Sequence, residues 1–256
     1  MKTKLILVDL DETLLRSDKT ISENTADVLK RCQKAGMLVG FCTSRGKVTI
    51  TQWENQIQPD IVICNGGGNI YQEKKLIHTE SFSVEESNAI LSKAYEVCGK
   101  DAEITIDTVE NIFWNRDTNK SEAFADFAKF HNFIDFPEPA LKICVQTDDK
   151  EKATEIAGSV EHCDYLPFSD IPWYKFSSSL ATKENAIRYI SEKLNISTEE
   201  MIAFGDDFND IGMLKLCGKG IAMGNAIKEV KAVANDITKT NNEDGVVYYL
   251  EKNFLL

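Results

Sequence analysis

MIAFGDDFND, residues 201–210, places three aspartates and an asparagine within five positions, directly after an apolar run. A short apolar run bounded by polar residues is typical of a buried strand in a parallel sheet, so Met201–Phe204 is predicted to be one. The polar residues then fall at its carboxyl end, where open α/β sheets bind their ligands. Asp206 is the best-placed metal ligand, and Asp210, one helical turn later, is expected to support it. A solvated Asp-rich turn that caps the next helix is the alternative interpretation.

Two more polar segments follow predicted strands in the same way. Asp9-Leu10-Asp11-Glu12-Thr13 comes after the strand Lys4–Val8, and Thr43-Ser44-Arg45 comes after the strand Met37–Cys42. Because parallel strands end at one edge of a sheet, we expect all three segments to converge there. Clustered carboxylates cannot all stay ionised without a cation, and with one they form an oxygen-only metal site. A lysine and two hydroxyls remain to hold an anion, so the pattern predicts an enzyme that handles phosphate.

The pair Asp9 and Asp11 is suited to two-step phosphoryl transfer. One carboxylate can attack phosphorus and form an aspartyl-phosphate. The other, two residues on, can protonate the leaving oxygen and later deprotonate the attacking water. The backbone N–H of Leu10 is expected to bind a phosphate oxygen, as loop amides often do. Two acids separated by one residue also occur by chance in solvated loops, so this pair decides little without the other segments.

The remaining polar groups each have a structural alternative. Thr43 and Ser44 fit a helix N-cap, but hydroxyls at a helix N-terminus also form an anion site, and both interpretations can hold together. Lys183 opens a predicted helix, where its charge opposes the helix dipole. That placement favours a functional role over an ordinary surface lysine.

Composition excludes several classes of partner. The formal net charge is −12 and the pI is near 4.8, which argues against nucleic acid and against anionic membranes as partners. Acidic residues interrupt the first apolar run too early for a signal peptide, and no segment approaches the roughly 18 apolar residues of a membrane span. The seven cysteines include no CxxC pair. We expect reduced core thiols and a cytoplasmic protein.

The order of elements predicts an α/β fold with a Rossmann-like parallel sheet as its core and an inserted α+β cap domain. We expect residues 1–81 and 181–256 to form the core and residues 82–180 to form the cap. Helices are predicted from Ser22 to Ala35, Lys47 to Gln56, Val84 to Cys98, Ser121 to His131, Lys150 to Ala157, Lys183 to Leu194, Asp210 to Leu216, Ala226 to Ala234 and Gly245 to Lys252.

Taken in this order, the segments resemble the haloacid dehalogenase superfamily, and the pattern is similar to its Cof-like branch, which carries a large α/β (type IIB) cap. The branch-level resemblance lies in residues 205–214, 221–226 and 242–246. It implies a phosphatase that hydrolyses a small phosphorylated metabolite, such as a sugar phosphate, with Asp9 as the nucleophile and Asp11 as the acid/base. It further implies Mg²⁺ bound by Asp9, Asp206 and the backbone carbonyl of Asp11. The phosphoryl oxygens would be held by Thr43, Ser44, Lys183 and Asn209.

Two residues depart from this pattern. Glu12 stands where many members have glycine, and glycine admits backbone angles that Glu avoids. Ser44 stands where this branch usually has glycine, which brings a hydroxyl close to the phosphate. Neither change removes a catalytic group.

Three alternatives remain. A receiver-type phosphoacceptor domain has a similar acidic cluster but about half this length, and Asn65-Gly66-Gly67-Gly68 lacks the spacing of a dinucleotide-binding loop. A phosphomutase needs a second phosphate site in the cap, and Arg116 is the only arginine there. The sequence indicates neither the metabolite nor the oligomeric state. Five residues of the predicted cap are suggested as substrate contacts: Trp114, Arg116, Trp173, Tyr174 and Lys175. Both tryptophans also fit a cap core.

Overall fold

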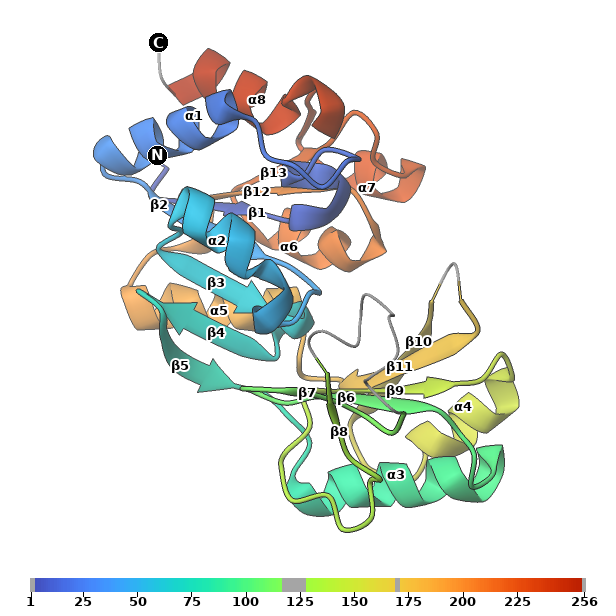
Figure 1. The fold of residues 1–256 in the computed structure, drawn as a ribbon. Coiled ribbons are helices and arrows are strands. Elements are labelled where there is room, and N and C mark those ends of the chain that lie inside the picture. The colour runs from blue at the N-terminus through green and yellow to red at the C-terminus, as the bar shows by residue number, and fades with distance from the viewer. Residues whose placement is uncertain (1–2, 117–127, 169–170, 255–256) are drawn as a thin grey trace. The chain divides into compact units, whose positions relative to one another are not determined.

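The strand that precedes the Asp-rich turn, β12 (Met201–Gly205), lies inside an eight-stranded sheet (Figure 1). This is a computed structural model, and it describes residues 3–116, 128–168 and 171–254. β12 pairs in parallel with β1 (Leu5–Val8), and β1 pairs in parallel with β2 (Leu38–Cys42). All residues of β1 and β12 are buried, as expected for strands covered on both faces. The sheet is completed by β14 (Asp236–Ile237), β13 (Lys219–Ala222), β3 (Ile61–Cys64), β4 (Asn69–Gln72) and β5 (Lys75–Thr79).

Helices form two layers around this sheet, which is the arrangement that buries an apolar parallel sheet. In one layer, α1 (Glu23–Lys34) packs against α2 (Thr51–Ile57) and α8 (Gly245–Phe254). In the other layer, α6 (Ile211–Leu216) packs against α5 (Lys183–Leu194) and α7 (Lys228–Val233). The predicted cap residue Ser22 accepts a hydrogen bond from the backbone N–H of Thr25 at the start of α1. The α/β fold class predicted from the sequence is confirmed.

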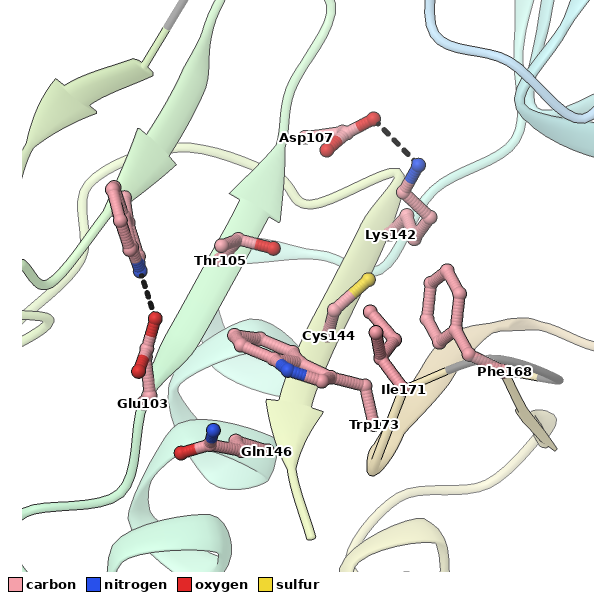
Figure 2. Close-up of a pocket in the computed structure, with 10 residues that line it drawn as sticks. Glu103, Thr105, Asp107, Lys142, Cys144, Gln146, Phe168, Ile171 and Trp173 are labelled. Atoms are coloured by element: carbon pink, nitrogen blue, oxygen red, sulfur yellow. Dashed lines mark hydrogen bonds and ion pairs between the residues drawn. The ribbon is translucent and has the colours of Figure 1, made fainter. Parts of the chain in front are cut away.

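A second sheet has six strands in the order β10-β11-β9-β6-β7-β8, and only its β7–β8 pair is parallel. Its side chains alternate between two faces. One face carries apolar residues such as Ile143 and Phe176, which form a core with residues of the paired helices α3 and α4. The other face carries Cys144, Gln146 and Trp173 (Figure 2). The elements are α3 (Val84–Cys98), β6 (Ile104–Asp107), β7 (Ile112–Trp114), β8 (Ala128–Phe130), β9 (Lys142–Gln146), α4 (Lys150–Ala157), β10 (Cys163–Pro167) and β11 (Trp173–Ser178).

The contacts divide the chain into two compact units. The first comprises Met1–Arg45, Ile50–His78 and Thr182–Leu256, and the second comprises Gly46–Thr49 and Thr79–Ala181. Each unit has a hydrophobic core of its own. Within the described ranges, we find no helix with the length and hydropathy of a membrane span.

One predicted helix is wrong where it can be compared with the structure. The sequence pattern predicts a helix from Ser121 to His131, of which residues 121–127 lie outside the described residues. Ala128–Phe130 form the strand β8, which pairs in parallel with β7. Pairing with a neighbouring strand outweighs a local helical pattern, because intrinsic propensity is only a weak preference. The segment from Lys47 to Ile57 is helical as predicted but divides into a 3₁₀ turn and α2.

Candidate active site

The predicted site residues meet in one cavity of about 200 Å³ in the first unit. Glu12 and Asp207 also line it. Leu10 is fully buried and does not line the cavity with its side chain, so its predicted contribution is confined to the backbone N–H. The predicted side chains that line the cavity are Asp9, Asp11, Thr43, Ser44, Lys183, Asp206, Asn209 and Asp210.

Asp9 lies at the end of β1, where its backbone N–H donates to the carbonyl of Phe204 in β12. Lys183 is the first residue of α5, directly after the N-cap Thr182, and it is only 3% exposed. Its ammonium donates to Asp9 Oδ1 at 2.7 Å and to Asp210 Oδ1 at 2.6 Å. Lys183 is therefore a buried link between two carboxylates, and not a surface lysine.

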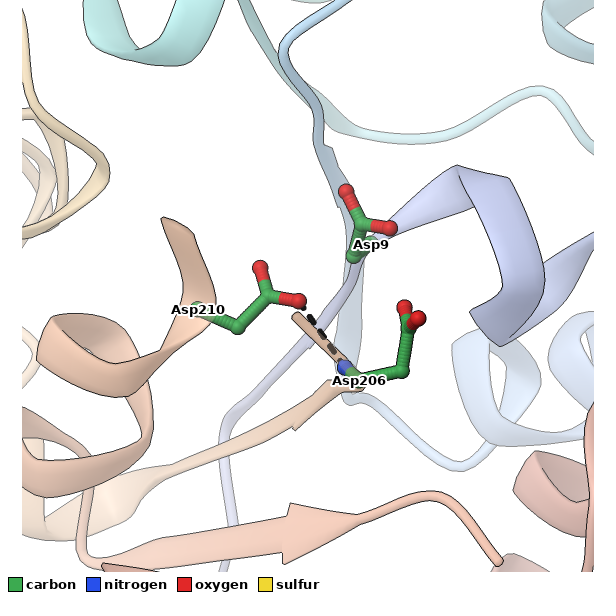
Figure 3. Close-up of side chains that lie close together, drawn as sticks. All are labelled: Asp9, Asp206 and Asp210. Carbon is green, nitrogen blue, oxygen red and sulfur yellow. Dashed lines mark hydrogen bonds between the residues drawn. The ribbon is translucent and has the colours of Figure 1, made fainter. Parts of the chain in front are cut away.

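The turn after β12 fixes Asp206 and Asp210 in different ways. Asp210 Oδ2 accepts the backbone N–H of Asp206 at 2.9 Å (Figure 3) and that of Asp207 at 3.2 Å. Gly205 permits this close approach, because a Cβ there would lie 2.5 Å from the Cβ of Asp210. Asp206 Oδ1 accepts from the Thr13 hydroxyl at 2.7 Å, across 193 residues of sequence. Asp210 thus acts as a support with both oxygens occupied by donors of the chain.

The site concentrates negative charge. Six carboxylates and one ammonium line the cavity. Burial raises the pKa of Asp9 well above its ordinary value, with Lys183 opposing the shift and Asp210 and Asp206 adding to it. Burial likewise raises the pKa of Asp206 to about 7, against the Thr13 hydrogen bond. The pKa of Lys183 is raised because the charges of Asp210 and Asp9 outweigh its burial, so this ammonium stays charged.

The donor set fits a hard divalent cation. Asp9, Asp206 and Asp210 each offer a carboxylate oxygen, and these atoms lie within 4.8 Å of one another. Asp9 Oδ2 and Asp206 Oδ2 accept no hydrogen bond from any residue in the described ranges, whereas both oxygens of Asp210 do. Carboxylate and carbonyl oxygens are the ligands that Mg²⁺ takes in proteins. A phosphate dianion would also need such a cation to enter a cavity of this charge.

Asp11 is bound by Arg45, a residue for which the sequence predicted no role of its own. Arg45 Nε donates to Asp11 Oδ2 at 2.6 Å and Arg45 Nη2 donates to Oδ1 at 2.7 Å, and Lys19 adds a contact at 3.1 Å. The Arg45 guanidinium also stacks over the Trp53 ring at 5.0 Å. Burial raises the pKa of Asp11, but the hydrogen bonds and charge of Arg45, and then those of Lys19, hold this pKa below its ordinary value. Arg45 belongs to a segment that was predicted to converge on this edge of the sheet, but its pairing with Asp11 was not predicted.

Glu12 has a left-handed backbone conformation, with φ 55° and ψ 10°, which glycine adopts more readily than other residues. Two asparagines far along the chain hold this turn. Asn225 Nδ2 donates to the Glu12 carbonyl at 2.7 Å, and Asn241 Nδ2 donates to Glu12 Oε2 and to the Leu15 carbonyl, both at 3.0 Å. Lys19 also donates to Glu12 Oε1 at 3.1 Å. The departure from glycine therefore leaves the turn in place, with contacts that offset an unfavourable conformation.

The hydroxyl residues Thr43 and Ser44 and the amide residue Asn209 line the same cavity as the carboxylates. Thr43 is buried at the end of β2, and its Oγ1 accepts the Arg45 backbone N–H at 3.1 Å. Ser44 is half-buried and Asn209 is exposed. The prediction that Thr43 and Ser44 cap a helix is wrong, because the next helical segment begins only at Lys47; the Thr43 hydroxyl instead holds a turn at the cavity.

The residues suggested as substrate contacts in the second unit divide between the two faces of its sheet. Trp114 and Trp173 line a cavity there, and Arg116 pairs with Glu103 near its edge. Tyr174 belongs to the apolar core on the other face, so the suggestion that it contacts substrate is wrong. Lys175 follows Trp173 by two residues and is opposite Cys144 in register.

Comparisons with known proteins agree with this geometry. Residues 6–250 match the family described as haloacid dehalogenase-like hydrolase. The 5-amino-6-(5-phospho-D-ribitylamino)uracil phosphatase YitU of Bacillus subtilis is 32% identical, with 100% of each chain covered. A haloacid dehalogenase-like hydrolase from Bacteroides thetaiotaomicron is 26% identical, with a TM-score of 0.85 over 99% of this chain and 100% of that one.

A further solved structure is a subclass IIB sugar phosphatase of the same superfamily, at 22% identity. Its TM-score is 0.82, over 99% of this chain and 100% of the other, and this likeness concerns the fold. Together these matches exclude the receiver-type and dinucleotide-binding alternatives. They confirm the resemblance inferred from the sequence.

Proposed function

Since the chain belongs to the haloacid dehalogenase-like hydrolase family and is a phosphoric monoester hydrolase, we propose that it is a Mg²⁺-dependent phosphatase acting on a small phosphorylated metabolite. The reaction would proceed through an aspartyl-phosphate on Asp9. The observation that carries the proposal is the buried arrangement of Asp9, which has one oxygen bound to Lys183 and the other without a donor among the described residues. That oxygen would bind Mg²⁺, which leaves the oxygen held by Lys183 to attack phosphorus.

Mg²⁺ would be held by Asp9, Asp206 and the backbone carbonyl of Asp11, with Asp210 supporting the turn. When bound, it supplies positive charge that offsets the charge of the phosphoryl oxygens and of the carboxylates. The hydrogen bond of Thr13 leaves one oxygen of Asp206 for such a ligand. Asp210, with both oxygens occupied, orients the backbone of residues 206 and 207.

In the first half of the reaction, a carboxylate oxygen of Asp9 forms a bond to phosphorus while the ester oxygen leaves. The phosphoryl oxygens would be held by Lys183, by the hydroxyls of Thr43 and Ser44, and by the Asn209 amide and the Leu10 backbone N–H. Such fixed donors stabilise charge that is spread over the phosphoryl oxygens in the transition state. The leaving oxygen takes a proton from Asp11.

In the second half, a water molecule attacks the phosphorus of the aspartyl-phosphate and releases Asp9 and inorganic phosphate. Asp11, now ionised, accepts the proton of that water. The contacts of Arg45 favour the ionised form of Asp11 and so suit this half of the cycle. For the first half, Asp11 must leave Arg45 in order to carry a proton.

We place substrate selection in the second unit, which we propose to be the cap, with boundaries near residues 82 and 180. YitU acts on a phosphorylated ribitylaminouracil, as its name states, and this chain is proposed to take a metabolite of similar kind, a phosphomonoester of a sugar-like or polyol carrier. A cytoplasmic location is also proposed, because the described cysteines are all free thiols.

The test is hydrolysis of an aryl phosphate by the full chain with Mg²⁺ and with excess chelator. We expect turnover with Mg²⁺ only, and none for Asp9→Asn. Asp207→Asn is the matched control, because Asp207 lines the same cavity and its side chain caps the short helix that follows, accepting the Phe208 N–H at 2.7 Å, which Asn can also do. Equal turnover in chelator, or full activity of Asp9→Asn, would refute the proposal.

A further inference from the structure

Trp53 is a buried residue of α2 that contacts two separate segments of the first unit. Its ring lies under the Arg45 guanidinium, whose central carbon is 5.0 Å from the ring centroid. Its indole N–H donates to the backbone carbonyl of Lys19 at 2.9 Å. Arg45 and Lys19 are the residues that bind the side chain of Asp11 within the described ranges. One side chain, for which the sequence predicted no role, thus contacts both of them.

The ring gives the Arg45 guanidinium a fixed surface to lie on. A guanidinium is attracted to the face of an aromatic ring, and indole is the best of the aromatic side chains for this contact. From that position, Arg45 donates to both oxygens of Asp11, which fixes the orientation of the carboxylate as well as its position. The side chains of this pair are 31% and 39% exposed, so water competes for them and the pair alone would be weak. The ring adds the contact that restrains it.

The indole N–H holds Lys19 through its backbone. Lys19 has a φ of 62°, which is an unfavourable conformation for a residue other than glycine. Its N–H donates to the Arg16 carbonyl at 2.8 Å, and the Arg16 N–H donates to the Thr20 carbonyl at 3.0 Å, so the chain makes a tight turn here. The hydrogen bond from Trp53 stabilises this turn, from which Lys19 Nζ reaches Asp11 Oδ1 at 3.1 Å.

We propose that Trp53 is a positioning residue for the acid/base. It keeps Arg45 and Lys19 in place while Asp11 leaves Arg45 to carry a proton, and then returns to accept the proton of the attacking water. This inference rests on the proposed function, in which Asp11 serves both halves of the reaction. Trp53 is not among the residues that line the catalytic cavity, so its effect is exerted through the two cations. Its loss should therefore slow mainly the hydrolysis of the aspartyl-phosphate.

The first test needs no turnover. In the full chain with isotope-labelled arginine, NMR follows the exchange of the Arg45 Nε–H with water, and Arg45→Lys assigns the signal. Trp53→Leu removes the ring and the N–H, and the exchange should become at least about fivefold faster. Trp53→Phe keeps a smaller ring but no N–H donor, and its rate should lie between those of the wild type and Trp53→Leu. Exchange at the wild-type rate in Trp53→Phe and Trp53→Leu overturns the proposal, and Trp53→Phe decides alone if Trp53→Leu does not fold.

The second test follows the second half of the reaction. An activated aryl phosphate and Mg²⁺ form the aspartyl-phosphate in a single turnover, and samples quenched in acid report its decay. The decay should be at least about fivefold slower in Trp53→Leu. Ile57→Ala is the control, because Ile57 is an apolar residue of the same helix that is only 1% exposed. Equal slowing by Ile57→Ala would show a general loosening of α2 and overturn the proposal.

A double variant separates positioning from a general structural effect. Asp11→Asn leaves no acid/base to be positioned, so the addition of Trp53→Phe should not slow the decay further. Further slowing in that background overturns the proposal. If the wild type forms no aspartyl-phosphate, the proposed function fails, whereas the exchange of the Arg45 Nε–H still decides whether Trp53 holds this cation.

Discussion

Lys183→Met removes the only cation found among the described residues that line the catalytic cavity, while keeping a side chain of similar length. In the wild type, its ammonium lies 2.7 Å from Asp9 and 2.6 Å from Asp210. Asp210 keeps the two backbone N–H groups that bind its other oxygen, whereas Asp9 loses the only side-chain donor found for it among the described residues. Removing one partner of a buried ion pair costs roughly 3–5 kcal/mol. With about 2–4 °C per kcal/mol in a chain of this size, the melting temperature should fall by roughly 6–20 °C in chelator.

Two further measurements, with Mg²⁺ and at two pH values, make this prediction specific. Mg²⁺ at 100 times its dissociation constant should restore about 2.7 kcal/mol, because it binds the folded site. Without metal, the loss should be smaller at pH 5 than at pH 8. The reason is that burial raises the pKa of Asp9 and Lys183 opposes that rise, so without Lys183 the Asp9 carboxyl holds a proton at the lower pH.

The assay is thermal and denaturant unfolding of both proteins, with chelator and with Mg²⁺. Lys193→Met in the same helix is the control, since Lys193 is exposed. The reasoning is refuted if Lys183→Met is as stable as Lys193→Met in chelator, or if Mg²⁺ has no effect on either.

Three other predictions follow from the same site. Asp11→Asn should slow turnover by about 10²–10⁴ while keeping the stabilisation by Mg²⁺, because the metal contact there is a backbone carbonyl; wild-type turnover would contradict the acid/base role. In the metal-free protein, Asp206 has a pKa raised to about 7, so the folded state holds this proton more tightly than the unfolded state. The free energy of unfolding should therefore fall as pH rises from the ordinary carboxyl range through about 7, and Mg²⁺ should lessen the fall. Denaturant titration measures this, and a free energy of unfolding that does not change with pH would contradict the prediction. Asn241→Ala should cost about 1–3 kcal/mol, because it removes the hydrogen bonds that Asn241 donates to the Glu12 side chain and to the Leu15 carbonyl. Unfolding at the wild-type denaturant concentration would show these contacts to be dispensable.

The sequence was sufficient to predict the convergence of the site, because that depends on strand order. Each acidic or hydroxyl segment follows an apolar strand, and β12, β1 and β2 are neighbours that pair in parallel. Their carboxyl ends must then share an edge. The family resemblance supplied the roles assigned to individual residues, which composition and spacing left open.

Contacts that depend on how loops are placed could not be predicted from the sequence. Asn241 reaches Glu12 across 229 residues, and no local pattern in either segment indicates the other. The same is true of Arg45 and Asp11, whose pairing requires two loops to lie side by side. β8 shows the other kind of failure, since a helical pattern near residue 128 yields to pairing with β7. Burial of Lys183 was indicated only by its unfavourable position in the first turn of α5.

The most direct test of the central claim is the phosphoryl group on Asp9. Asp11→Asn would be mixed with Mg²⁺ and an activated aryl phosphate, quenched in acid within one turnover, digested and examined by mass spectrometry. Removal of the base for the second step should let the intermediate accumulate, and the peptide that contains Asp9 should gain the mass of one phosphoryl group. Asp9→Asn should show no such gain. Turnover without an adduct on that peptide, or an adduct on another residue, would contradict the account.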